Sequence, residues 1–360
     1  MLARAGWPRV SYVLVLGLGL GACGADDSTD DEPSPAQPVV DASGLGAQPP
    51  PPNGGKQGSG TTPTVMAVRR FFLGLQDPDG KPNPDAWVQY GYNLDGLIST
   101  TKGTNHCELR PNTPPTNKKD GESGIDDSFG QNIVPILRTL SPELENGQNQ
   151  AVETGKSTLL IVLDNLDAAA DQLDISGSVY ASGELGGAPT LDGTDRWPVV
   201  ESSIDPETNL ARSVIHGSYV SNGVWVARVQ GTLGVPIMLR EARVVVPVHD
   251  AVISMSIQGV GSTASARAGV MAGWVAADDL VSRLEQAVGA ASLGSLCPGS
   301  QYVEHGLRVV RQASDIVHGS ANGDPNVKCD AISLGIGFEA SAAQLGEQVV
   351  DPAVEDPCAH

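Results

Sequence analysis

The sequence is poor in basic and in aromatic residues. Its 360 residues include 22 Lys or Arg against 42 Asp or Glu, which gives a formal net charge of -20 at pH 7. Such an acidic surface repels nucleic-acid phosphates and anionic lipid headgroups, so we expect no nucleic-acid partner. Aromatic residues make up only 4% of the chain, which is few for the aromatic platforms that carbohydrate-binding clefts favour.

The usual catalytic motifs are also missing. The chain has no G-x-S-x-G elbow, no H-E-x-x-H helix and no S-x-x-K serine with its partner motifs. Thr154-Gly155-Lys156-Ser157-Thr158 imitates the end of a phosphate-binding loop, but Gln150 stands where the first glycine belongs. A strand is expected after this segment, whereas a phosphate-binding loop leads into a helix. The sequence therefore favours a binding or structural protein over an enzyme.

Long apolar runs are absent apart from one near the N-terminus. The run from Val10 to Leu20 is shorter than the roughly 20 residues that a membrane span needs. Arg4 and Arg9 precede it, and Leu20-Gly21-Ala22-Cys23 closes it with small residues before a cysteine. This order resembles the bacterial lipoprotein signal, whose cysteine is lipidated and becomes the first residue of the mature protein.

The resemblance predicts how the protein is attached. Residues 1–22 are expected to be a signal peptide, and Cys23 is expected to carry the acyl chains that hold the protein on the membrane. Gly24 is not an obvious inner-membrane retention residue. We therefore expect a lipid-anchored protein of the outer membrane that faces the periplasm or the cell surface, with a ligand or envelope partner that the sequence does not identify.

The remaining four cysteines form an even set in an exported chain, which favours two disulfides. Cys297 and Cys329 flank one predicted helical segment, so we pair them, and this leaves Cys107 with Cys358. A metal site at His106 and Cys107 is the alternative. Adjacent side chains point apart on a strand and no C-x-x-C partner is present, so the disulfides are preferred.

A two-residue period dominates from Val65 onward. Ile332, Leu334, Ile336 and Phe338 alternate with small or polar residues, and Asn222-Gly223 separates two β-rich segments as a tight hairpin turn requires. This pattern predicts an antiparallel β-sandwich over residues 65–345. The Pro-, Gly- and Asp-rich residues 23–64 are expected to be a disordered linker, and residues 346–360 an acidic tail.

Two helices are predicted near the C-terminus. Asp278 and Asp279 open the first, in front of an apolar face that includes Leu280 and Leu284. Val303, Leu307 and Val310 mark the second, although Gly306 in its interior costs about 1 kcal/mol relative to alanine. The two helices form an insertion before the last strand of the sandwich.

Four segments resemble a known group of proteins. They are residues 90–96 with the N-x-D-G turn at Asn93, residues 120–130 with the D-G-x-x-G-I-D order that begins at Asp120, the stretch from Val270 to Leu284, and residues 329–338, which begin with Cys329-Asp330-Ala331-Ile332-Ser333. Through these segments the chain is similar to a family of lipoproteins abundant in myxobacteria. The resemblance implies a single exported domain and brings no known activity with it.

Acidic turns suggest a cation site. Asp95, Asp120, Asp126 and Asp127 occur with glycines, and carboxylate oxygens on tightly bent loops are the ligands of calcium. The twelve-residue EF-hand spacing is absent, and Asp-Gly and Asn-Gly pairs also form turns without any metal. We expect structural Ca²⁺ at these four aspartates as the one cofactor.

A hydrolase is the alternative function. Glycoside hydrolysis uses two carboxyl groups that flank the bond to be broken, and a β-sandwich can hold two acids across a concave sheet. Asp126 and Glu184 are the candidate pair. No residue pattern supports their role beyond residue type, so the principal prediction is a binding or structural module that is not an enzyme.

Overall fold

The computed structural model describes residues 39–40, 46–169, 171–290, 299–319 and 324–352. All of these residues belong to one compact unit. Cys23, Cys297 and Cys358 lie outside the described residues, so the lipid anchor at Cys23 stays a prediction.

Strands dominate the described residues. Ten of them form one mixed, largely antiparallel sheet in the order β10-β11-β12-β13-β4-β5-β6-β8-β9, with β3 paired to β6 off this path. The strands are β3 (Lys56–Gln57), β4 (Thr64–Phe72), β5 (Leu159–Leu163), β6 (Gln172–Ala181), β8 (Ser213–Ser221), β9 (Val224–Gln230), β10 (Leu233–Leu239), β11 (Ala242–Gln258), β12 (Ser265–Ala276) and β13 (Ala331–Ala342). The prediction of a mainly β, antiparallel body is confirmed.

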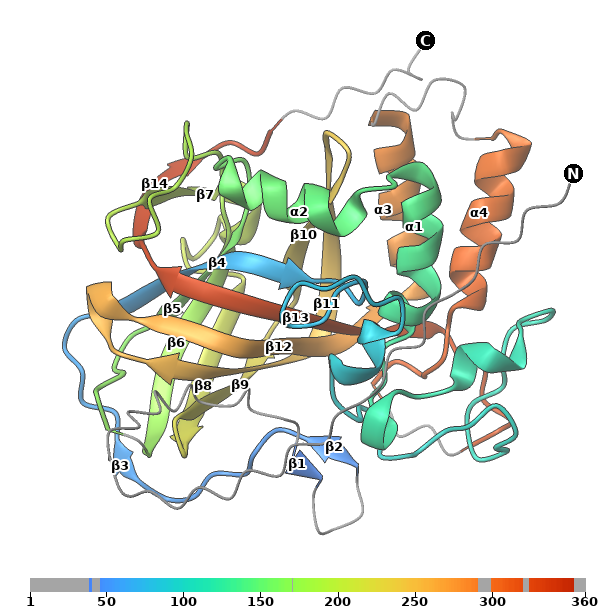
Figure 1. Cartoon of the computed structure of the whole chain (residues 1–360), viewed down its shortest axis with the longest axis horizontal. Helices are drawn as coiled ribbons and strands as arrows, with labels where there is room; N and C mark the ends of the chain where they lie inside the picture. The colour runs from blue at the N-terminus through green and yellow to red at the C-terminus, as the bar shows by residue number, and fades with distance from the viewer. Residues whose placement is uncertain (1–38, 41–45, 170, 291–298, 320–323, 353–360) are drawn as a thin grey trace, which may run out of the picture. The chain divides into compact units, whose positions relative to one another are not determined.

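The sheet closes on itself through its longest strand, β11. The first part of β11 pairs with β10, whereas the part from Val252 to Ser256 pairs with β9 on one side and β12 on the other. Because β9 ends the strand order, this pairing joins the sheet into an uneven ring (Figure 1). The sandwich is not confirmed. Alternation fixes which side of a strand is buried, and a sandwich and a ring both bury alternate residues.

Helices pack against the strands, and their apolar side chains join the same hydrophobic core. Among the described residues they include α1 (Val134–Leu140), α2 (Leu144–Glu153), α3 (Ala277–Ala290) and α4 (Gln301–Gln312). Leu144, Leu280 and Leu307 belong to the core that the strand residues form. The helices α3 and α4 confirm the predicted C-terminal pair, while α1 and α2 were not predicted. In the described part of the chain, no helix is both long and apolar enough to cross a membrane.

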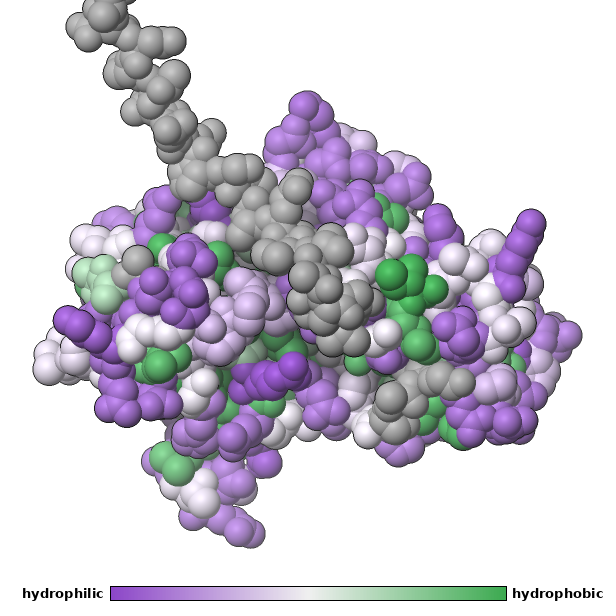
Figure 2. Space-filling model, turned by 90° about the horizontal axis from the view of Figure 1, so that it is seen from below, coloured by the Kyte–Doolittle hydropathy of each residue, from purple (hydrophilic) through white to green (hydrophobic). Residues whose placement is uncertain are grey.

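The described part of the predicted linker differs from the expectation. Residues 46–60 lie on the body and are not a disordered spacer: Ala47 is fully buried, and the Gly58 N–H donates to the Leu173 carbonyl at 2.9 Å. An extended Pro-rich backbone makes no hydrogen bonds within itself, so its polar groups can pair with a neighbouring strand instead. The face on which β3 lies is largely hydrophilic (Figure 2).

Two short sheets complete the body. In one, β1 (Val39–Val40) pairs with β2 (Ala47–Gln48), and in the other β14 (Gln344–Val349) runs parallel to β7 (Arg196–Val200). The predicted acidic tail from residue 346 therefore begins inside a strand. The sequence of β14 is too polar to show a buried face, and its pairing comes from backbone hydrogen bonds to β7.

Candidate functional site

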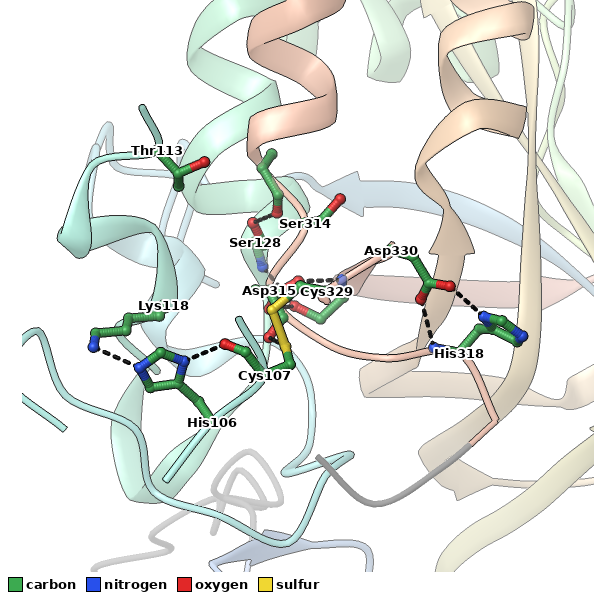
Figure 3. Close-up of a disulfide and its surroundings, with 12 residues drawn as sticks. His106, Cys107, Thr113, Lys118, Ser128, Ser314, Asp315, His318, Cys329 and Asp330 are labelled. Atoms are coloured by element: carbon green, nitrogen blue, oxygen red, sulfur yellow. Dashed lines mark hydrogen bonds and ion pairs between the residues drawn. A yellow bond between two sulfur atoms is a disulfide. The ribbon is translucent and has the colours of Figure 1, made fainter. Parts of the chain in front are cut away.

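A disulfide ties the loops of the first half of the chain to the start of β13 (Figure 3). Cys107 and Cys329 are bonded at a sequence separation of 222, with their Cα atoms 5.2 Å apart. The Glu108 N–H donates to the Val327 carbonyl at 2.7 Å, and the Cys329 N–H donates to the Glu108 carbonyl at 2.9 Å. This short ladder places the two cysteines side by side.

Both predicted disulfide pairings are therefore wrong. We expected Cys297 with Cys329 and Cys107 with Cys358, but the partner of Cys329 is Cys107. Helix boundaries suggested the first pairing, whereas the backbone ladder at Glu108 decides the real one. The sulfur of Cys107 is consumed in this bond, which also removes it as a metal ligand. The disulfide is consistent with an extracytoplasmic protein.

Beside the disulfide lies a cluster of carboxyl groups, which we call the acidic cluster: Asp95, Asp120, Asp126, Asp127 and Asp315. Asp126 and Asp127 are 3% and 2% exposed. The Sγ atom of Cys107 lies 3.2 Å from the Asp315 carbonyl oxygen. The structure thus brings the four predicted aspartates into one neighbourhood and adds Asp315.

The carboxylates of the acidic cluster accept hydrogen bonds from loop backbones. Asp126 Oδ2 accepts from the N–H groups of Leu94 at 2.7 Å and Asp95 at 3.3 Å. Asp127 Oδ1 accepts from the N–H of Gly130 at 2.8 Å and, from the distant strand β13, the N–H of Gly335 at 2.9 Å. These side chains thereby fix three chain segments to one another.

Asp120 and Asp315, which are partly buried, do the same. Asp120 accepts from the Ser99 N–H, and Asp315 accepts from the Ser333 N–H at 2.9 Å and the Ser333 hydroxyl at 2.5 Å. The Oδ2 atom of Asp127 is buried and makes no hydrogen bond within the described part of the chain. Loop anchoring is therefore the role that the contacts of the acidic cluster show.

Burial, together with the nearby carboxylates, raises the pKa values of four members of the acidic cluster. Burial is the largest cause, and the neighbouring carboxylates add to it: the pKa of Asp120 rises to about 8 and that of Asp315 to about 7. Burial also raises the pKa of Asp126 and of Asp127 well above the usual range, again with a contribution from Asp315. The acidic cluster therefore holds protons near neutral pH.

Calcium at the four predicted aspartates stays a prediction. Over the described residues, no group of three or more His, Cys, Asp or Glu side chains is arranged to hold a metal ion. Backbone N–H groups already occupy several of the oxygens that calcium would use. Backbone N–H donors and the raised pKa values of these carboxyl groups both reduce the charge repulsion.

A groove of about 520 Å³ opens next to the acidic cluster. One wall is the segment from Tyr92 to Gly96, and another is the segment around Val317. Strands β9, β11 and β12 contribute the residues between these walls. Tyr92 packs against Val252 and Ala272, which fixes the first wall to the sheet.

The 92–96 wall is a loop held by side-chain hydrogen bonds. Asn93 Oδ1 accepts from the Gly96 N–H at 2.6 Å, and Asn93 Nδ2 donates to the Leu97 carbonyl at 2.5 Å. Asp126 holds the same loop from below through Leu94. The predicted N-x-D-G turn thus forms, and its role is to position the wall of the groove.

A strained bulge in β11 carries the most distinctive side chain of the groove. The register with β12 shifts between His249 and Val252, and Asp250 adopts a left-handed φ of 49°. Its Oδ2 accepts a hydrogen bond of 2.8 Å from Nε1 of Trp274, whose indole stacks on the His249 ring with centroids 4.6 Å apart. Bulges and positive φ angles concentrate at functional sites, because they redirect side chains at a cost in stability.

Gly273 makes this bulge possible. A Cβ atom at this position would lie 2.6 Å from the His249 carbonyl oxygen, which is closer than real Cβ atoms approach. The two backbones can therefore come together only because residue 273 has no side chain.

Charges of both signs line the groove. Arg228 and Asp250 are both exposed. The described residues offer Arg228 no ion pair and leave Asp250 Oδ1 without a hydrogen bond. At the rim, His318 lies 2.5 Å from Asp330 through its Nδ1 atom and 5.9 Å from the Trp274 ring (Figure 3).

The predicted hydrolase pair does not form a site of this kind. Asp126 is buried beneath the 92–96 loop, so its carboxyl group cannot contact a substrate in an open groove. Glu184 lies beyond β6, where its charge acts on Lys156. Asp126 therefore anchors a loop, whereas Glu184 acts on Lys156.

Sequence reasoning missed Arg228, Asp250, Trp274 and Asp315. One signal was visible for Asp250: His249-Asp250 interrupts the alternation of Val244, Val246 and Val248 with polar neighbours. The other three carry no local signal, because each stands in an ordinary strand or loop context. Strand pairing alone brings them to the groove and the acidic cluster.

Comparison with protein-family models, with curated proteins and with solved structures finds no match to this chain. The resemblance to myxobacterial lipoproteins accordingly stays a prediction. The geometry of the groove is therefore the basis for a functional proposal.

Proposed function

We propose that this chain is a lipid-anchored, extracytoplasmic binding module that holds a small polar ligand in the groove beside Trp274. The observation that carries the proposal is the strained Asp250 at the β11 bulge, which lines the groove and accepts a hydrogen bond from the Trp274 indole. Backbone strain of this kind persists where the site uses it.

The chemistry of the groove favours a ligand with both an anionic group and hydroxyl or ammonium donors. Arg228 offers a guanidinium to the anion, and Asp250 accepts from the donors. The exposed part of the Trp274 indole adds apolar contact. Amino acids, amino sugars and sugar acids share this combination.

The proposal also includes the membrane anchor, the acidic cluster and the β body that carries the groove. An anchor at Cys23 in the outer membrane would expose the groove to the periplasm or the cell surface. Calcium at the acidic cluster would brace the 92–96 wall from below. A sandwich-like or ring-like body serves this role equally, because the groove depends only on β9, β11, β12 and the loops.

Binding is tested by melting the protein with a panel of amino acids, amino sugars and hexuronic acids. At least one class should raise the melting temperature of the unmodified chain, and Asp250→Asn and Arg228→Gln should each abolish most of that rise. Asp192→Asn, an exposed acid outside the groove, is the control that should keep it. The same melting temperature with every compound, or equal shifts in all variants, would refute the groove as the binding site.

A further inference from the structure

A second groove, of about 430 Å³, is lined by residues of α1, α3 and α4. We call it the helix groove. Its lining is almost entirely apolar and includes Leu137, Leu140, Leu284, Val303, Leu307 and Val310. Tyr302 stands at its edge with 82% of its surface exposed. A groove of this size is large enough for a small-molecule ligand.

Gly306 opens the helix groove. It lies inside α4, where glycine lowers helix stability relative to alanine. Its φ is not positive, and a Cβ atom at this position would meet nothing within 4 Å. Neither backbone conformation nor close packing therefore requires a glycine here, and the effect of its missing side chain is open space in the groove.

Cationic and donor groups stand at one edge of the helix groove. Arg308 Nη2 lies 2.6 Å from His305 Nδ1. An arginine can only donate, so Nδ1 accepts and the proton of the neutral ring lies on Nε2. His305 lines the groove, and both side chains thereby offer N–H donors at its edge.

Arg308 has no acidic partner among the described residues. Glu304, one turn earlier on α4, forms no ion pair with it. Arg311, one turn later, is by contrast paired with Asp278 at 2.8 Å. In a chain with a net charge of -20, an unpaired arginine beside an apolar groove is complementary to an anionic group attached to an apolar body.

We propose that the helix groove binds the hydrocarbon chain of a free long-chain fatty acid, with its carboxylate on Arg308 and His305. The apolar lining accounts for the hydrocarbon, and the guanidinium and imidazole donors account for the carboxylate. The space beside Gly306 accommodates the hydrocarbon chain of the fatty acid. This site is separate from the groove beside Trp274 and does not depend on it.

The test is calorimetric titration of the full mature chain with palmitate, in a Cys23→Ser background so that no covalent acyl chain competes. One palmitate should bind per chain. Gly306→Leu places a side chain in the groove and should weaken binding roughly tenfold or more, since it displaces several methylene groups. Gly306→Ala is the matched control, which should bind palmitate nearly as well.

The head group is tested separately. Arg308→Gln should weaken palmitate binding and leave hexadecanol binding unchanged, because only the acid carries a charge. Melting temperatures of Gly306→Leu and Arg308→Gln that are no lower than that of the unmodified chain would show that folding is intact. Palmitate binding that Gly306→Leu leaves intact would overturn the proposal. So would a Gly306-dependent dimer of the chain, or binding to phosphatidylglycerol vesicles without a one-to-one palmitate complex.

Discussion

The two grooves of this body differ in the chemistry of their lining residues. The groove beside Trp274 combines a strained strand bulge, exposed charges and a foundation of buried carboxyl groups. The helix groove has almost no charge in its lining, which includes Gly306 in the middle of a helix, where an added Cβ atom would meet open space. Each groove contains a residue that lowers stability: Asp250 through its left-handed backbone, and Gly306 through the low helix propensity of glycine. Residues of this kind mark the places where a fold has been shaped for a task.

The largest expected difference between the two grooves comes from the disulfide. Loss of a cross-link with a sequence separation of 222 should lower the free energy of unfolding by about 4 kcal/mol. Cys107 and Cys329 secure the loops near Trp274, so Cys107→Ala with Cys329→Ala should impair that groove first. Urea denaturation gives the stability, and hydrogen exchange of residues 92–96 against α4 gives the location. Equal loss of protection in both regions would contradict this difference.

Acidic pH should stabilise the body. The groups responsible are carboxyl groups of the acidic cluster, next to the groove beside Trp274, and Glu145. The folded-state pKa of Asp315 is about 7 and that of Asp120 about 8, both raised first by burial. Glu145, which accepts from the Leu73 and Leu75 N–H groups, is raised by burial to about 7. The folded state therefore binds protons more tightly than the unfolded state, so stability is greatest near pH 4 and declines as pH rises through 7 to 8.

The expected slope is up to about 1.4 kcal/mol per pH unit for each titrating group. Urea unfolding from pH 5 to pH 8.5 measures it, and Asp315→Asn should flatten the curve because the amide cannot ionise. Asp192, an exposed acid whose pKa is lowered to about 2 by Thr194 and Thr190, is the control, and Asp192→Asn should leave the slope unchanged. Stability that is constant or rises over this range would be incompatible with buried acids.

Calcium should act on the Trp274 side alone, if the predicted aspartates bind it. Binding to the folded state only would add about 2.7 kcal/mol at a hundredfold excess over Kd. The rise in melting temperature should be larger at pH 8 than at pH 5, because protons occupy the same carboxyl groups at low pH. Asp126→Asn should reduce it. Identical melting curves with calcium and with chelator would leave the aspartates as loop anchors only.

The smallest expected effect belongs to the helix groove. Gly306→Ala should raise the free energy of unfolding by about 1 kcal/mol, because alanine favours the helix and its methyl group meets open space. Thermal and urea unfolding measure the gain. A loss of stability would mean that the groove tolerates no added atoms, which would contradict its openness.

Local chemistry explains which parts of the fold could be predicted. Alternation over Ile332 to Phe338 predicted β13, and Asn222-Gly223 predicted the β8–β9 hairpin, whose φ angles of 51° and 78° are those that Asn and Gly tolerate. The C-terminal helices followed from apolar spacing. In each case neighbouring residues carry the information.

Long-range pairing explains what could not be predicted. The ring depends on β11 meeting β9 as well as β12, and no periodicity records which strands meet. Asp315 joins the acidic cluster only because Ser333 on β13 lies beside it. The acidic turns pointed to the correct neighbourhood, but the contacts that make a groove there come from strands far apart in the sequence.

The disulfide also decides how the body would bear a mechanical load. A pull on the two chain ends bypasses everything between Cys107 and Cys329, since the covalent bond is the shorter path for force. Strands β5 to β12 lie inside that bypass and carry no tension. The first strand before it, β4, and the first strand after it, β13, are hydrogen-bonded neighbours in antiparallel register. Tension on an anchored protein would therefore fall on strands outside the bypass, among them the β4–β13 pair and β14 where it pairs with β7, while the walls of both grooves made by residues inside the bypass keep their shape.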